Sequence, residues 1–275
     1  RGDENYQITS SDIPNTAIVP EADVTQSAGV VYQRGGRQHI RFSADWFETR
    51  KSGELDYLGA QDVIDYESYL PGRVIRAPAS PGDSYGVGPI EYVLTGNINL
   101  AWRRSENWNF AFDYGIKDIL GGNLDFYARY VYFQRYDVEV VPHAPVVDEL
   151  RDPDTASLDL VPHRINIGGG WQNHRFGFGV EERYFSSRVI PASQQALQGS
   201  NHIDAYDPVD AYIKGNLAFW DRTTARKPRL TAELRVNNLL NRPLPKFPTD
   251  PSGTGVEAYG DWRGQVYSFS FILSY

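Results

Sequence analysis

Charged side chains recur at every second position in several segments of this 275-residue chain. Successive side chains of a strand point to opposite faces, so residues with this spacing form one polar surface. Such a surface suits contact with another protein segment or guidance of a solute, and a merely hydrated wall is an equally good interpretation. The candidate residues of this surface are Arg41, Asp45, Asp113, Asp125, Arg129, Arg164, Lys214, Glu233 and Arg235.

A second group of candidates is aromatic and lies in the long connection 52–91, where residues 60–67 predict a helical turn. Its members are Tyr57, Tyr66, Tyr69 and Tyr85. Loop tyrosines can stack on a ligand, although more often they pack a loop against its neighbours. We predict these four as candidate ligand-contacting residues and keep the packing alternative open.

The sequence predicts neither a metal site nor a catalytic centre. Without cysteine there is no thiolate ligand, cysteine nucleophile or disulfide. The histidines show no metal-ligand spacing, and the acidic segment 137–160 lacks the EF-hand pattern, which favours a hydrated loop over a calcium site. No nucleophile, base and orienting group come together in the pattern, so we predict no enzymatic activity, no catalytic residues and no cofactor. A net charge of -8 argues against a nucleic-acid partner.

The elements that must carry these residues are β-strands with one apolar face. In the last nine residues Tyr, Phe, Phe, Leu and Tyr alternate with Ser, Ser, Ile and Ser. The same period of two recurs over residues 24–32, 38–48, 107–116, 123–136, 161–172, 175–185, 208–220 and 229–240. Each apolar run has about 9–11 residues, the length of a tilted strand across a bilayer. The opposite faces carry charges of both signs, which suits a hydrated or plugged interior better than a dry core.

The connections alternate between short and long, as in outer-membrane barrels with tight periplasmic turns and long extracellular loops. The short ones are 33–37, 117–122, 173–175 and 221–228, and the long ones are 49–91, 137–160, 186–207 and 241–264. Residues 92–116 keep one parity throughout, so we predict one long strand there rather than a hairpin turning at 105–107.

Nine strands leave two open edges, which hydrocarbon does not tolerate, and single-chain bacterial barrels have even strand numbers. We therefore predict an all-β chain that forms about nine C-terminal strands of a transmembrane antiparallel up-and-down β-barrel. Residues 1–22 are expected to be the tail of an extracellular loop, with earlier strands upstream of Arg1.

Several segments, in this order, resemble the C-terminal half of TonB-dependent outer-membrane receptors. Residues 236–241 (VNNLLN) are similar to the family's VxNLFN, residues 45–51 (DWFETRK) to its DYFxIxxK, and residues 161–166 (VPHRIN) to its PxHRxN strand start. Residues 20–21 (PE), 61–67 (QDVIDYE), 73–76 (RVIR) and 263–265 (RGQ) fit the same order. Leu240 and Tyr275 stand where the family usually has Phe, and residues 107–109 (NWN) replace a common Gly-x-Asp.

The resemblance covers nearly the whole chain, residues 1–275, and implies a barrel of about 22 strands. It implies a TonB-energised receptor in the outer membrane of a Gram-negative bacterium, importing a siderophore, oligosaccharide, vitamin or peptide. The implied partners are the plug and earlier strands of the same receptor, the TonB complex acting through that plug, and outer-membrane lipid with lipopolysaccharide. A passive porin and a non-transporting glycan-binding surface protein remain the alternatives.

Overall fold

The computed structural model describes residues 8–81, 86–152, 160–216, 229–248, 255–256 and 260–274. These residues form two compact units. Unit 1 comprises Arg1–Gln26, Glu48–Ser105 and Tyr136–Asp148, and unit 2 comprises Ser27–Phe47, Glu106–Arg135 and Glu149–Tyr275. Strands β2, β3, β7 and β8 contribute residues to both units.

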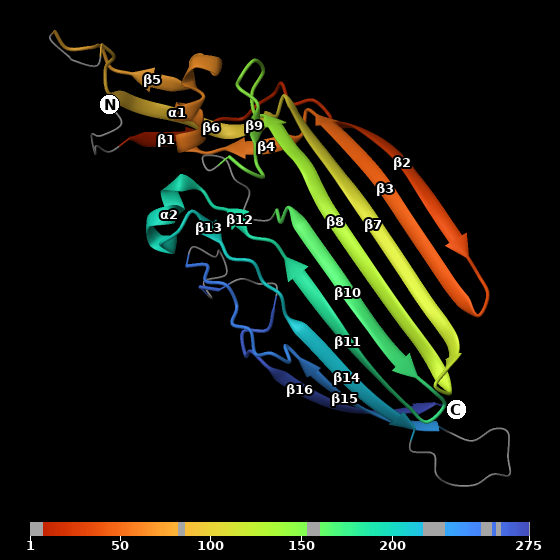
Figure 1. Ribbon diagram of the computed structural model, residues 1–275. Coiled ribbons are helices and arrows are strands. Elements are labelled where there is room, and N and C mark those ends of the chain that lie inside the picture. The colour runs from red at the N-terminus through yellow and green to blue at the C-terminus, as the bar shows by residue number, and fades with distance from the viewer. Residues whose placement is uncertain are drawn as a thin grey trace. The chain divides into compact units, whose positions relative to one another are not determined.

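Unit 2 is built on a nine-strand sheet, ordered β16-β15-β14-β11-β10-β8-β7-β3-β2 along its path (Figure 1). The strands are β2 (Ala22–Arg34), β3 (Gln38–Ser52), β7 (Trp102–Ile119), β8 (Gly122–Glu139), β10 (His163–Gln172), β11 (Phe176–Phe185), β14 (Val209–Asn216), β15 (Arg229–Asn237) and β16 (Val266–Ser274). Every pairing from β8 to β16 is antiparallel between neighbours along the path. The predicted up-and-down antiparallel sheet of nine strands is therefore confirmed.

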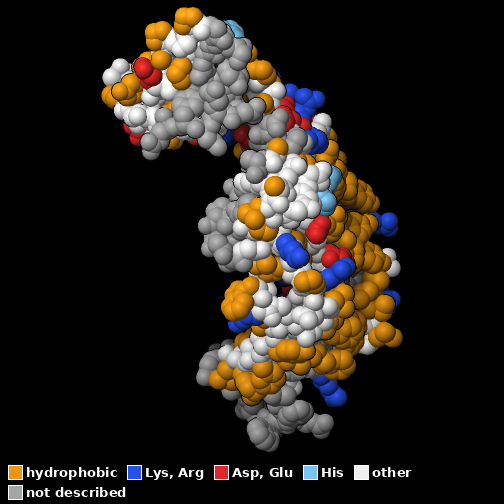
Figure 2. Space-filling model, turned by 90° about the vertical axis from the view of Figure 1, so that its left-hand side faces the viewer, with side chains coloured by type: hydrophobic (Ala, Val, Ile, Leu, Met, Phe, Trp, Pro, Cys, Tyr) orange, Lys and Arg blue, Asp and Glu red, His pale blue; other side chains and the backbone are white. Residues whose placement is uncertain are grey.

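Opposed residues of adjacent strands share a face, so the register defines an apolar face of this sheet. One row joins six strands through directly opposed partners. Its members are Leu124, Trp171, Phe178, Ile213, Leu234 and Phe269. Phe178 is 51% exposed and Phe269 is 63% exposed, so among the described residues no second layer covers these side chains. Figure 2 shows apolar side chains gathered along the strands of unit 2.

Unit 1 is a small packed body around a four-stranded sheet. Its elements are β1 (Thr9–Asp12), β4 (Leu55–Leu58), α1 (Ala60–Asp65), the 3-10 helix η1 (Glu67–Tyr69), β5 (Val74–Arg76), β6 (Ile90–Asn99) and β9 (Val147–Asp148). Strand β6 pairs in parallel with β1 and antiparallel with β4 and β5, while β9 pairs with the end of β8. The predicted helical turn in the long connection is confirmed by α1 and η1.

The core of unit 1 brings together residues from distant parts of the sequence. Its buried members are Leu58, Val63, Val93, Ile98, Leu100, Val138, Val141 and Ala144. Val63 and Val93 have no exposed surface. Segments predicted as solvent-exposed loops thus fold around an apolar core of their own, and residues 9–12 of the predicted loop tail form β1.

The prediction of one long strand over residues 92–116 is wrong, because β6 and β7 are separate strands. At the break, the Leu100 N–H donates to Glu54 O at 2.8 Å and the Ala101 N–H to Glu139 O at 3.1 Å. The Asn99 amide donates to Val19 O at 2.9 Å. At residues 99–101 the chain therefore bonds to other segments and leaves the strand. The alternation of side chains continues across these residues and so does not reveal the break.

A smaller cluster in unit 2 follows β11. It contains β12 (Arg188–Val189), α2 (Ala192–Gln198) and β13 (His202–Ile203), and its buried residues are Ile190, Ile203 and Phe247. The sequence pattern did not predict α2. Strand β15 ends at Asn237, before the predicted limit, because Asn238 takes a left-handed backbone with φ 53°. Within the described residues, no helix is long and apolar enough to span a bilayer.

Candidate functional site

The polar face of the nine-strand sheet is the candidate site. Its clearest row runs through Asp125, Gly170, Gly179, Tyr212, Arg235 and Ser268. A neighbouring row opposes Lys214 to Glu233. Since side chains two positions apart share a face, Arg129 and Arg164 lie on this face as well.

Ion pairs extend the polar face to strands β3 and β7. The Asp113 carboxylate accepts a hydrogen bond from Arg129 and lies 3.5 Å from the Arg41 guanidinium. Arg41 and Asp45 share a parity on β3, and the Asp45 carboxylate lies over Gly29 of β2, where an added Cβ would come within 2.1 Å of it. All nine charged residues predicted from the sequence therefore lie on one face.

Two tyrosine rings on this face rest on glycine backbone. A Cβ added to Gly168 would lie 2.7 Å from the Tyr127 ring, and one added to Gly179 would lie 2.6 Å from the Tyr212 ring. Only glycine leaves room for such a contact between neighbouring strands. Gly168 of β10 and Gly179 of β11 are therefore the positions where these strands make room for the rings.

Cationic side chains cover the same rings. The Arg129 guanidinium lies 5.5 Å from the centre of the Tyr127 ring, and Arg235 lies 5.3 Å from that of Tyr212. The Lys214 ammonium lies 5.6 Å from the Tyr212 ring centre. These distances fall within the range of cation–π attraction. Tyr127 and Tyr212 thus hold several of the predicted charges in fixed positions.

A depression of about 300 Å³ lies between these rings. Its polar lining consists of Asp125, Tyr127, Gln172, Glu181, Tyr212 and Lys214. Carboxylates, hydroxyls, an amide and an ammonium converge here, which suits hydrogen bonding to a polar solute or to an opposing peptide segment. Among the described residues, no group of three His, Asp or Glu side chains has the geometry of a metal site.

Sequence reasoning missed two charged residues of the polar face, Glu181 and Arg183, and it did not count Asp210 among the candidates although the alternation of segment 208–220 places Asp210 on the polar side. The Arg183 guanidinium lies 2.9 Å from Asp210, whose other oxygen accepts from the Asn238 N–H at 2.8 Å. These groups line a second depression of about 330 Å³, together with Tyr206 and Asp261. The alternation of Glu181 and Arg183 with Val180 and Tyr184 is visible in the sequence. It was overlooked because the preceding positions on the same face, 177 and 179, are glycines and show no polar side chain.

Asp261 belongs to a loop outside the strands and is held ionised by its neighbour. Hydrogen bonds from the Arg263 side chain lower the pKa of Asp261 to about 2. Its carboxylate lies 2.5 Å from Arg263 Nη2. At neutral pH Asp261 therefore stays ionised and paired with Arg263 beside this depression.

The predicted loop tyrosines of unit 1 do not form one cluster. The Tyr57 hydroxyl donates to the Asp12 carboxylate at 2.6 Å. Tyr66 packs against the core of unit 1, while Tyr69 is exposed at the end of η1. Tyr85 lies outside the described residues.

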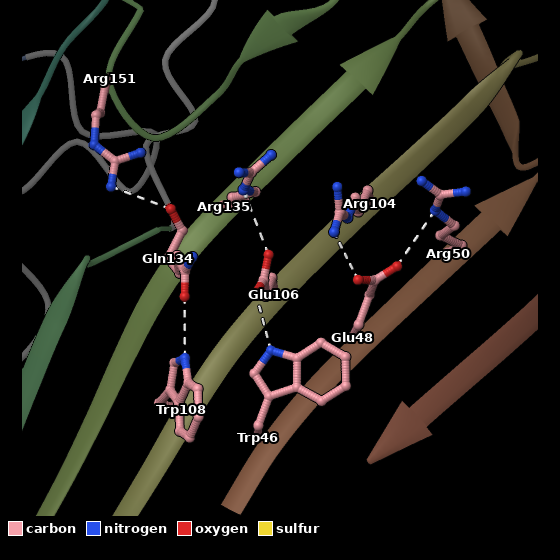
Figure 3. A network of polar contacts seen from close by, with 9 residues as sticks. All are labelled: Trp46, Glu48, Arg50, Arg104, Glu106, Trp108, Gln134, Arg135 and Arg151. Carbon is pink, nitrogen blue, oxygen red and sulfur yellow. Dashed lines mark hydrogen bonds and ion pairs between the residues drawn. The ribbon is translucent and has the colours of Figure 1, made fainter. Parts of the chain in front are cut away.

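At one end of the nine-strand sheet, tryptophan side chains on the apolar face lie next to charged side chains (Figure 3). The Trp46 N–H donates to the Glu106 carboxylate at 2.9 Å, and Arg135 lies 3.4 Å from the same carboxylate. The Trp108 N–H donates to the Gln134 side chain at 3.0 Å.

Next to these residues, the Tyr132 ring stacks on His163 with centres 4.9 Å apart. His163 also bonds the Tyr130 hydroxyl at 2.9 Å. The apolar face thus ends in aromatic side chains whose polar atoms have partners.

In unit 1, Figure 3 shows a related arrangement of paired charges. The Glu48 carboxylate lies 2.6 Å from Arg104 and 3.4 Å from Arg50. Glu54 pairs with Arg103 at 2.9 Å. Each of these carboxylates is neutralised by at least one guanidinium.

Comparison with known proteins finds similarity among solved structures. The chain is similar to a crystal structure of a mutant ferric enterobactin receptor, PfeA, from Pseudomonas aeruginosa, with a TM-score of 0.50 and 12% sequence identity. The similarity covers 91% of this chain and 30% of the receptor chain, so this chain spans less than a third of its length. No protein-family model matches, and no curated protein matches. At this identity the similarity shows the fold of the antiparallel sheet.

Proposed function

We propose that residues 1–275 form the C-terminal part of the barrel of a TonB-dependent receptor in the outer membrane of a Gram-negative bacterium. The observation that carries the proposal is the pair of opposite faces on the nine-strand sheet. An apolar face with Phe178, Ile213 and Phe269 exposed to solvent would be strongly unfavourable in water, and it suits hydrocarbon. The fold similarity to a ferric enterobactin receptor agrees with this choice.

The end of the apolar face supports the same placement. Trp46, Trp108 and the stacked Tyr132–His163 pair have the amphipathic character of side chains at a membrane–water boundary. Beyond them Glu106 and Arg135 supply charge that belongs with lipid head groups and water. We assign this end, from which the long connections emerge, to the extracellular side and to lipopolysaccharide.

The polar face then lines the inside of the barrel. In this proposal its charges, including Arg41, Asp113 and Arg129, contact a plug domain or guide solute past it. Because β2 and β16 end the described sheet, closure requires further strands, in a barrel of about 22. The N-terminal half of the same receptor would supply these strands and the plug, which would contact the TonB complex.

The solute belongs to the class of scarce molecules that need active uptake, and a ferric siderophore is the first to test because the similar receptor carries ferric enterobactin in its name. Capture is assigned to the long connections, with Tyr57, Tyr66, Tyr69 and Tyr85 as candidate contacts. Tyr57 and Tyr69 are both exposed, whereas Tyr66 packs against the core of unit 1. Because the Tyr57 hydroxyl already donates to Asp12, Tyr69 is the best placed of the described three.

The test uses the complete gene product in a Gram-negative host. We expect it in the outer-membrane fraction, extractable only with detergent, with faster migration on unboiled gels. Uptake of radiolabelled ferric siderophores should require both the protein and an intact TonB system. Uptake that continues without TonB would identify a passive porin, and a protein released without detergent would contradict the membrane assignment.

A further inference from the structure

The depression of about 330 Å³ lies on the polar face of the nine-strand sheet, at the end from which the long connections emerge. Three strands supply its wall: Arg183 of β11, Asp210 of β14 and Asn237 of β15. Each of these lies two positions from, or directly opposite, a residue already assigned to the polar face. The rest of the lining consists of Tyr206, Asn238, Gly260, Asp261 and Gly264. Every lining residue carries a polar side chain or is glycine, so a molecule that fills the depression must present polar groups around its edge.

The charged groups of this depression already have partners. The Arg183 guanidinium lies 2.9 Å from the Asp210 carboxylate, which also accepts from the Asn238 N–H at 2.8 Å. The Asp261 carboxylate accepts hydrogen bonds from the backbone and the side chain of Arg263. With these pairs counted the depression is neutral. A charged solute would therefore lose its hydration here without gaining an unpaired counter-charge.

What the depression offers instead is hydrogen-bonding capacity that the protein itself leaves unused. Tyr206 is only 3% exposed, yet its hydroxyl has no hydrogen-bond partner among the described residues. A Cβ added to Gly260 would lie 2.6 Å from this hydroxyl, so a side chain at position 260 would block it. The Asn237 side chain also lacks a partner within the part of the chain that the structure describes. Because buried polar groups are normally hydrogen-bonded, these two groups point to a ligand.

Resting on the proposed function, in which the polar face lines the barrel interior, we propose that this depression binds a neutral sugar unit of the imported solute. Each hydroxyl of a sugar ring both donates and accepts a hydrogen bond. One hydroxyl bonds the Tyr206 hydroxyl, while its neighbours on the ring bond the Asn237 amide and the outer N–H groups of Arg183. A peptide matches this lining less well, because its backbone presents one N–H and one C=O per residue.

The test is isothermal titration calorimetry on the complete gene product, purified in a detergent without sugar, such as dodecyldimethylamine oxide. The probes are the neutral oligosaccharides maltohexaose, xylohexaose and mannohexaose, the anionic oligogalacturonate, and ferric enterobactin. We expect at least one neutral oligosaccharide to bind. Tyr206→Phe removes only the hydroxyl and should weaken that binding about fivefold, the effect of one lost hydrogen bond, and Asn237→Ala should weaken it to a similar extent.

The matched control is Tyr267→Phe, which removes a hydroxyl from the opposite face of the sheet. Tyr267 is opposed to Val236, next to Asn237, and its hydroxyl donates to the Gln265 side chain at 2.8 Å. This variant should bind the sugar as the wild type does. No binding by any neutral oligosaccharide, or equal binding by the wild type, Tyr206→Phe and Asn237→Ala, would overturn the inference. So would binding of oligogalacturonate or ferric enterobactin that Tyr206→Phe weakens, because the depression would then take an anion.

The same samples separate this inference from the proposed function. Extraction only by detergent and faster migration on unboiled gels test the membrane placement, and both should be the same for the wild type and the variants. If both are observed while no neutral oligosaccharide binds, only the sugar site is wrong. If the protein needs no detergent, the proposed function fails, whatever the protein binds.

Discussion

Unit 1 and the nine-strand sheet of unit 2 use apolar side chains in opposite ways. In unit 1, Val63, Val93 and Leu100 are buried in a core that the unit builds for itself. In the sheet, Phe178, Ile213 and Phe269 are among the most exposed large side chains of the described residues. Burial of apolar surface is the main favourable term in folding.

Unit 1 therefore gains that term from its own residues, whereas the sheet must gain it from its surroundings. The two units also place their charged side chains differently. The sheet places its charges on the face opposite the apolar rows, where the ion pair of Arg183 with Asp210 and the contacts of Arg129 with Asp113 lie. In unit 1 the charges of the Glu67–Arg76 pair lie outside the buried apolar core of that unit. Alternating polar and apolar residues show that a strand has two different faces. They identify what surrounds the apolar face only once it is known whether other residues of the chain bury that face.

The largest expected effect is the loss of a core side chain in unit 1. Leu100→Ala removes a side chain that is 2% exposed, and the loss of contacts together with the remaining cavity should destabilise unit 1 by about 2–5 kcal/mol. Amide hydrogen exchange should accelerate over residues 55–76 and 90–99. Phe269→Ala on the exposed apolar face is the control, and it should leave those amides unchanged. Equal acceleration in both variants would show that the two regions share one stabilising core.

The second prediction tests the medium of the apolar face. Phe269→Arg puts a cation on that face and should destabilise the barrel in phospholipid vesicles by about 2–4 kcal/mol if position 269 lies near the midplane. Ser268→Arg, one residue away on the polar face, is the matched control and should change stability by less than a quarter of that amount. Urea unfolding of the complete gene product in vesicles measures both. Equal effects of the two substitutions would contradict the assignment of the faces.

The sequence alone predicts the sheet well because the evidence for it is local. Alternation in residues 267–274 or 123–132 is fixed by strand geometry, whatever the strand pairs with. Unit 1 could not be predicted in this way. Its core joins Leu58, Val93 and Val138, which are far apart in sequence, and β6 keeps the parity of β7 although its backbone turns at Leu100.

The candidate site was predictable in part for the same reason. Parity placed Asp113, Arg129 and Lys214 on one face, but the partners of each charge depend on register between strands. Parity also gave no hint that Tyr127 and Tyr212 rest on glycines of neighbouring strands, because that contact needs two strands to be aligned.

The third prediction concerns the contact between the Tyr212 ring and Gly179. Gly179→Ala places a Cβ 2.6 Å from the Tyr212 ring and should displace the ring, at a cost of about 1–3 kcal/mol. Arg235 and Lys214 would lose their positions over the ring. Gly215→Ala on neighbouring β14 is the control, with free space around its Cβ. Thermal unfolding in detergent compares the two variants. Equal unfolding midpoints would show that the contact of Tyr212 with Gly179 contributes nothing to the stability of the sheet.

The smallest expected effect is a pH dependence confined to unit 1. The Arg76 guanidinium donates to both oxygens of Glu67, at 2.8 and 2.6 Å, and these hydrogen bonds hold the pKa of Glu67 below its ordinary value. A group whose pKa is lowered in the folded state stabilises that state above its unfolded pKa, and the contribution is lost as the pH falls through the folded value. Hydrogen exchange over residues 67–76, corrected for intrinsic rates, should therefore accelerate slightly more between pH 6 and pH 3 than it does in Glu67→Gln. Strands β14 to β16 belong to unit 2 and keep their own ion pairs, such as Glu233–Arg235, in both proteins, so exchange there should show no matching difference. An identical pH response of the wild type and Glu67→Gln would mean that the ion pair is too well hydrated to stabilise unit 1.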